Sequence, residues 1–207
     1  RLEAGIRLTE LEERGEGVTG VVLVREREAL GEGEVGLLAE VEAAWDSPSE
    51  QAANLLIHAY AEQEKWGALI ALYQTLAGRA VGEEERVAYF RHIYEIRTEK
   101  QDDQVGAYAA TKIMCTLDPS DPVTRVRLLE HGGAIGEFED LAEFLQGVLD
   151  HEAVAGTDSE VEFQILLARL FQDNLDNAPA SCQYYELVAE GAQPEYVAEA
   201  RQQLRAL

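Results

Sequence analysis

The chain has 207 residues, of which 46% are apolar and 28% charged, a balance typical of a folded globular protein. Forty acidic residues against 17 basic ones give a formal net charge of −23, which disfavours nucleic acids and anionic membranes as partners and favours basic proteins or peptides. The two cysteines form no CxxC pair, so neither a disulfide framework nor a zinc site is indicated, and no apolar run is long enough to span a membrane. We therefore expect a cytoplasmic protein.

The first 49 residues carry the least regular pattern. A GxGxxG motif at 15–20 matches the glycine loop that cradles phosphates in protein kinases. No lysine follows it before Lys65, and the chain lacks HRD and DFG sequences, so the groups that bind ATP and magnesium are missing. We predict instead an N-terminal helical segment or partial repeat, with helices at 18–30 and 34–46. The β-prone run VVLV leaves a strand at 18–26 as the alternative.

From residue 50 onward a unit is repeated along the chain. Four six-residue segments each open with two apolar residues: LLIHAY at 55–60, YFRHIY at 89–94, LLEHGG at 128–133 and LLARLF at 166–171. Their starts are 34, 39 and 38 residues apart, a step that fits two helices and two turns. Each segment is followed by a second stretch with apolar residues at helical spacing. The pattern predicts four helix pairs, at about 50–78, 83–116, 122–152 and 158–190.

Capping and turn residues stand between the expected pairs. Asp121 is a suitable N-cap, and Pro122 after it suits the first position of a helix. Gly156 is expected to stop the second helix of the third pair, and Asp158 or Ser159 to start the next pair. Pro194 is expected to open a terminal helix within 191–207.

These repeats resemble the tetratricopeptide repeat (TPR) family. In the first unit, Leu56 and Tyr60 stand at the positions of the family's leucine and tyrosine. Trp66 and Tyr73 stand at the positions of its two further aromatic residues. LDP at 117–119 is similar to the family's closing motif, whereas Gly133 stands where the third unit should have its tyrosine, so the repeats are degenerate. The resemblance covers about residues 50–190. It implies an all-α fold, a right-handed solenoid of antiparallel helix pairs, in which the first helix of each pair lines a concave groove.

One position of the repeated segment carries nitrogen-rich side chains. If the second apolar residue of each segment enters the core, the fourth residue points about 200° away from it, toward the groove. This reasoning predicts a row formed by His58, His92, His131 and Arg169. The other candidate partner-binding residues on the same face are Asn54, Glu62, Glu95 and Gln172.

Two alternatives to this row remain open. Each imidazole could simply hydrogen-bond a neighbouring helix, as half-buried histidines commonly do. A one-residue slip in the third unit would place Glu130 on the face in the position of His131. If three imidazoles do share the groove, protonation between about pH 7.5 and about pH 5 should strengthen the binding of an acidic ligand.

The expected function is a non-catalytic scaffold for protein–protein interaction, one segment of a longer acidic repeat protein. The sequence has no nucleophile elbow, HExxH motif or Walker loop, so no catalytic residue is assigned. One histidine per helix also spreads the imidazoles too far apart for zinc, so neither a metal nor a cofactor is expected. The alternative is a structural self-assembly module whose end helices stack. An exposed apolar face on 194–206 or on 1–14 would favour that alternative.

Overall fold

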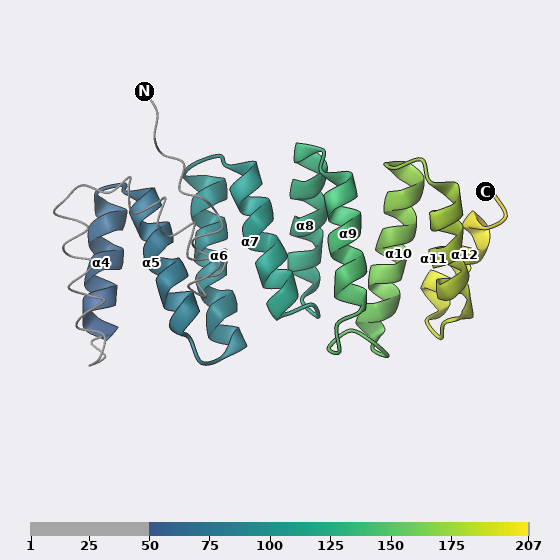
Figure 1. Cartoon of the computed structure of the whole chain (residues 1–207), viewed down its shortest axis with the longest axis horizontal. Helices are drawn as coiled ribbons and strands as arrows, with labels where there is room; N and C mark the ends of the chain where they lie inside the picture. The colour runs from purple at the N-terminus through teal and green to yellow at the C-terminus, as the bar shows by residue number, and fades with distance from the viewer. Residues whose placement is uncertain (1–49, 207) are drawn as a thin grey trace, which may run out of the picture. The chain divides into compact units, whose positions relative to one another are not determined.

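A computed structural model of the chain describes residues 50–206, and every regular element in that range is an α-helix (Figure 1). The all-α prediction is therefore confirmed for these residues. The expected N-terminal helices, the strand alternative and the glycine motif all lie outside the described range. The chain divides into two compact units, Arg1–Val81 and Gly82–Leu207, and each is considered by itself below.

The first unit contributes two described helices that pack on each other, α4 (Glu50–Glu62) and α5 (Trp66–Arg79). Leu56 and Tyr60 are buried one turn apart on α4, because residues four positions apart share a helix face. The apolar residues Leu69, Ile70 and Tyr73 of α5 are buried as well. The burial of Leu56 agrees with the expected core position of the second residue in its segment.

The second unit contains seven helices in its described residues: α6 (Glu83–Glu99), α7 (Gln104–Leu117), α8 (Pro122–Ile135), α9 (Phe138–Leu149), α10 (Asp158–Asp173), α11 (Ala178–Glu190) and α12 (Pro194–Gln203). Consecutive helices in this unit contact one another and stand side by side in chain order (Figure 1). In this unit, each of the ranges expected from the repeats corresponds to two consecutive helices. The next helix, α12, begins at Pro194 as predicted.

Local chemistry explains where α8 begins and ends. The Asp121 carboxylate accepts hydrogen bonds from the backbone amides of Val123 and Thr124, and Pro122 is the first helical residue. Gly136 ends the helix with a φ of +76°, a left-handed conformation that glycine adopts without steric cost. The predicted cap and helix start at residues 121 and 122 are confirmed.

The end of α9 differs from the expectation. Gly156 has a φ of +75° but lies in the turn before α10, because α9 already ends at Leu149. Between them, Val154 is fully buried, with an exposed fraction of 0%. The turn that brings Val154 into the core therefore begins directly after Leu149, and not at Gly156 as the sequence indicates.

The helices of the second unit fall into two sets that are bridged by side chains. We call α6, α8, α10 and α12 the even helices, and α7, α9 and α11 the odd helices. Polar contacts join successive even helices, and others join successive odd helices, for example Tyr108 on α7 with Asp140 on α9. The apolar core that holds the two sets together includes Leu128, Leu145, Phe163 and Leu167.

Candidate partner-binding surface

The predicted partner-binding residues occupy different environments in the structure. On α4 of the first unit, Asn54, His58 and Glu62 are exposed. On α6 of the second unit, His92 and Glu95 are about half-exposed, and the His92 Nδ1 lies 3.3 Å from a Glu95 carboxylate oxygen. These five residues thus lie on accessible helix surfaces.

Arg169 and Gln172 lie on α10 and make contacts with other helices. Arg169 donates two hydrogen bonds to the Glu199 carboxylate on α12, at 2.7 Å and 2.6 Å, and this partner raises the pKa of the guanidinium. The Gln172 amide oxygen accepts a hydrogen bond from the Tyr185 hydroxyl at 2.9 Å, and its nitrogen donates to Gln203. Both residues thus connect α10 to its neighbours.

His131 is buried between three helices, with an exposed fraction of 9%. Its Nδ1 lies 2.7 Å from the Gln104 amide oxygen on α7, and its Nε2 lies 3.0 Å from the Tyr94 hydroxyl on α6. Because the amide oxygen can only accept, Nδ1 carries the proton and Nε2 accepts from the tyrosine. Both nitrogens of the neutral imidazole are therefore satisfied, and the expected place of His131 in an open groove is wrong.

The charged form of His131 is disfavoured. Burial lowers the pKa of the imidazole, and the positive charge of Arg127 lowers it further, whereas Glu130 acts in the opposite direction. The Arg127 guanidinium itself lies 4.5 Å from the centre of the Tyr94 ring. The expected pH-dependent change of the groove therefore cannot come from His131 as an exposed cation.

A slip of one residue in the third unit explains this burial. In the fourth unit the second apolar residue of the segment, Leu167, is fully buried, and Arg169 points outward. In the third unit the fully buried residue is the first one, Leu128. Residues three apart share a helix side, so His131 follows Leu128 inward and Glu130 becomes the exposed residue.

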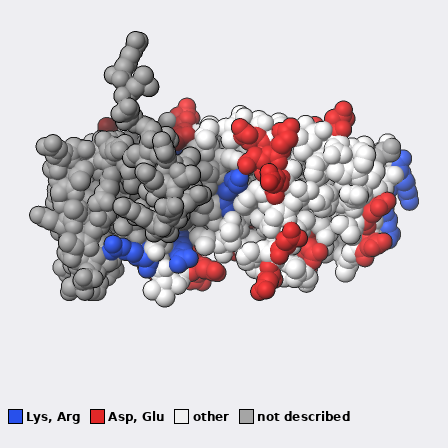
Figure 2. All heavy atoms as spheres, viewed as in Figure 1, with Lys and Arg blue, Asp and Glu red and all other residues white. Residues whose placement is uncertain are grey.

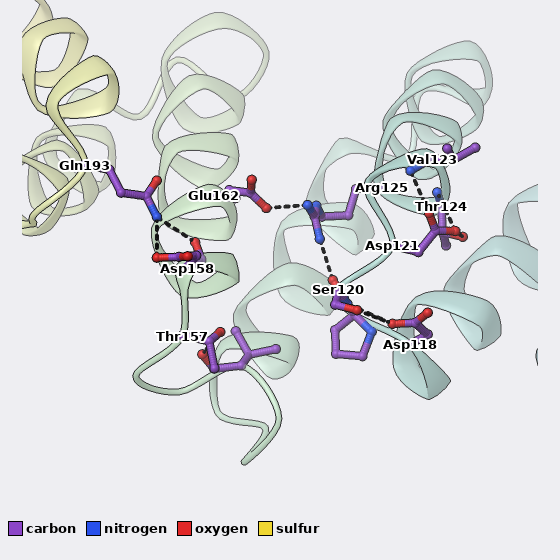
Figure 3. A network of polar contacts seen from close by, with 12 residues as sticks. Asp118, Ser120, Asp121, Val123, Thr124, Arg125, Thr157, Asp158, Glu162 and Gln193 are labelled. Carbon is purple, nitrogen blue, oxygen red and sulfur yellow. Dashed lines mark hydrogen bonds and ion pairs between the residues drawn. The ribbon is translucent and has the colours of Figure 1, made fainter. Parts of the chain in front are cut away.

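Arg125 is a polar residue of this region that the sequence did not single out. Its exposed fraction is 7%, its guanidinium donates 2.6 Å to the carbonyl oxygen of Pro119, and it lies 5.5 Å from the centre of the Phe163 ring. Figure 3 shows it reaching from α8 to the Glu162 carboxylate on α10. The available signal was its position three residues before Leu128, on the buried side of α8.

The same view shows a second link between even helices. The side-chain nitrogen of Gln193, just before α12, donates to the Asp158 carboxylate at the start of α10 at 3.0 Å (Figure 3). Together with the contacts of Arg125, His131 and Arg169, this link joins each even helix to the next. The polar side chains of the even helices thus serve largely to hold these helices together.

The first half of α8 exposes two apolar side chains. Val123 and Val126 are 53% and 54% exposed and lie on adjacent turns. Glu130, Gly133 and Ala134 continue the same exposed side. We give the name even surface to six exposed residues of α6, α8 and α10: His92, Glu95, Val123, Val126, Glu130 and Arg169.

Acidic side chains outnumber basic ones in the described part of the chain. On the face that Figure 2 shows, the acidic side chains of the described part form several clusters, and the basic side chains are fewer. Within residues 50–206, no group of three or more His, Cys, Asp or Glu side chains is placed to hold a metal ion. None of the helices in that range is both long and apolar enough to cross a membrane.

Comparisons of the chain with protein-family models, with curated proteins and with solved structures found no match.

Proposed function

We propose that the chain is a non-catalytic interaction scaffold, a right-handed solenoid of TPR-like antiparallel helix pairs that binds a peptide or a partner protein on the even surface. The observation that carries the proposal is the exposure of Val123 and Val126, at 53% and 54%, on the outer side of α8. Interfaces are centred on apolar contacts surrounded by a polar rim. Here the two valines form the apolar centre and the charged residues of α6 and α8 form the rim.

The charge of the chain supports a basic partner. The net charge is −23, and the rim residues Glu95 on α6 and Glu130 on α8 are exposed. A positive partner would be drawn to such a surface at low salt, and the attraction would weaken as added salt shortens the Debye length. Nucleic acid, whose phosphates are repelled by these carboxylates, is not a proposed partner.

The exposed side of α12 favours partner binding over end-to-end stacking. Its exposed residues include Glu195, Arg201 and Gln202, while Ala200 is fully buried against the preceding helices. A self-assembly module that stacks through this helix would expose an apolar face here. The corresponding test at residues 1–14 lies outside the described part of the chain.

The experiment compares two lysine variants of the full chain in pull-downs from the source cell, followed by mass spectrometry. Val126→Lys places a positive charge in the apolar centre of the even surface, so proteins bound there should be depleted at least about tenfold, equivalent to about 1.4 kcal/mol. Val105→Lys changes an equally apolar residue, 65% exposed on the odd helix α7, and serves as the matched control. Equal recovery of all proteins by both variants would refute the proposal.

Self-association is measured on the same proteins by analytical ultracentrifugation. The scaffold proposal expects a monomer whose mass does not change with concentration. A concentration-dependent oligomer that Val126→Lys dissociates would instead favour the self-assembly module.

A further inference from the structure

A recess lies between the odd helices α7 and α9, near the ends of both. Its volume is about 240 Å³, and its walls include Cys115, Pro119, Phe144, Val148 and His151. Cys115, Pro119 and Val148 are buried, and Phe144 is half-buried. The recess, which we call the α7–α9 cleft, shares no residue with the even surface.

The walls of the cleft are apolar and chemically inert. The pKa of the Cys115 thiol is raised to about 12, mainly by burial. The positive charge of Arg125 opposes this shift, and the nearby carboxylates of Asp118 and Asp121 add to it. The thiol is therefore protonated at neutral pH and acts as a small apolar surface rather than as a nucleophile. The His151 Nδ1, at the rim, accepts a hydrogen bond from the Ala153 amide at 3.2 Å.

Gly147 keeps one side of the cleft open. It lies in the last turn of α9 and lines the cleft. No atom lies within 4 Å of the position that a Cβ would take there, so packing does not require a glycine. A larger side chain at this position would project into the open space and occupy the cleft.

The size of the cleft restricts what it can hold. Sites for drug-sized ligands usually measure roughly 300–1,000 Å³, whereas a cavity of roughly 150 Å³ suffices for benzene. At about 240 Å³ the α7–α9 cleft fits one large apolar side chain. Aromatic side chains that fill such pockets often supply much of the binding energy of a protein interface.

The charges beside the cleft select a basic neighbour for that side chain. Glu143, one turn before Gly147, and Asp150 and Glu152, on either side of His151, are all exposed. Two basic groups lie beside the cleft, and both are paired with carboxylates. The Lys112 ammonium lies 5.1 Å from the centre of the Phe144 ring and 2.9 Å from the Asp140 carboxylate. The Arg125 guanidinium, which donates to the carbonyl of Pro119, is paired with Glu162. The rim is therefore net negative.

We propose that the α7–α9 cleft is a second docking site, which takes one aromatic side chain from a basic segment of a partner protein. The acidic rim contacts the cations that flank this side chain, while Cys115, Phe144 and Val148 enclose the ring. The site is independent of the even surface, and its test is separate from that of the proposed function.

The probe is the tripeptide Ac-Lys-Trp-Lys-NH2, titrated into the full chain and followed by the chemical shifts of backbone amides. We expect saturable shifts at Thr116, Gly147 and Val148, with a dissociation constant in the millimolar range. Ac-Glu-Trp-Glu-NH2 should bind at least about fivefold more weakly at about 0.01 M salt. This difference should shrink at about 1 M salt, where the Debye length falls from about 30 Å to about 3 Å. Ac-Lys-Ala-Lys-NH2 should not shift these amides, because it lacks the ring.

The decisive variant is Gly147→Leu, which should abolish the shifts without loss of helicity, because leucine favours a helix more than glycine does. Gly78→Leu is the matched control, since Gly78 also lies in a helix with nothing within 4 Å of an added Cβ. Binding that survives Gly147→Leu, or equal binding of the Lys- and Glu-flanked peptides at low salt, would overturn the proposal. Displacement of the peptide by octanoate with higher affinity would overturn it in favour of a fatty-acid ligand. Dimerisation that Gly147→Leu abolishes would overturn it in favour of a second copy of the chain.

Discussion

Replacing Arg125 tests whether the contacts between even helices hold the second unit together. This guanidinium is 7% exposed and joins the carbonyl of Pro119, the carboxylate of Glu162 and the face of the Phe163 ring. Arg125→Ala removes all of these contacts at once. It leaves a buried carbonyl without its donor and opens a space above the ring.

The cost follows from the contacts that are lost. Removing one partner of a buried ion pair typically costs about 3–5 kcal/mol, because the other charge is left without compensation. The side chain of Glu162 is 31% exposed and can turn to water, which places the expected loss near the lower end, about 3 kcal/mol. Arg125→Lys keeps the charge but not the planar fork that reaches two acceptors, so about 1–2 kcal/mol should be lost.

The assay is urea unfolding of the full chain at pH 7, followed by circular dichroism. With a slope of about 2 kcal/mol/M, a loss of 3 kcal/mol lowers the midpoint by about 1.5 M. Arg201→Ala serves as the control, because this arginine is exposed on α12 and surface changes usually stay within about 0.5 kcal/mol. Amide exchange should also accelerate in α8 and α10, where the lost contacts were made.

A midpoint for Arg125→Ala within about 0.3 M of the Arg201→Ala midpoint would refute the reasoning. In that case the bridge between α8 and α10 would contribute no more than a surface ion pair.

Three further predictions concern groups with displaced pKa values. Burial lowers the pKa of His131 from its unfolded value of about 6.5. The contribution of His131 to stability is therefore complete above that pH and is lost as the pH falls toward the folded pKa. His131→Phe should remove this part of the pH dependence of the urea midpoints between about pH 7.5 and about pH 5. The hydrogen bond from Lys112 lowers the pKa of Asp140, against the effect of burial, so its contribution is present above about pH 3.8 and is lost in more acidic solution. Asp140→Asn should cost only about 0.5–1 kcal/mol at pH 7, since the carboxylate is 46% exposed, and a loss above about 2 kcal/mol would contradict this. Burial acts to raise the pKa of Asp121, but the hydrogen bonds from Thr124 and Val123 outweigh this effect and lower the pKa. Asp121→Ala should lower the free energy of unfolding by about 1 kcal/mol at pH 7 in the same assay, and no loss would mean that the cap is not needed.

The sequence by itself determined the positions of most described helices. Helical periodicity and caps depend on residues within about four positions of each other, and such signals can be read without knowing the fold. Asp121 with Pro122 marked the start of α8, and Pro194 marked the start of α12, as the structure has them. The core positions of Leu56 and Leu167 followed from the same local pattern, and the residues two places after them are exposed.

The tertiary structure decided which side of α8 faces inward. The ring of Tyr108, on α7, lies against Gly132, where an added Cβ would meet a ring carbon at 3.1 Å. This aromatic ring belongs to α7, so the local pattern of α8 does not reveal it. With α8 seated in this way, Leu128 enters the core and His131 turns toward α6 and α7. The burial of Arg125 follows in the same way, because its partner Glu162 and the ring of Phe163 belong to α10. Contacts between residues far apart in the chain depend on how helices dock, and helical periodicity carries no information about a neighbour's side chains.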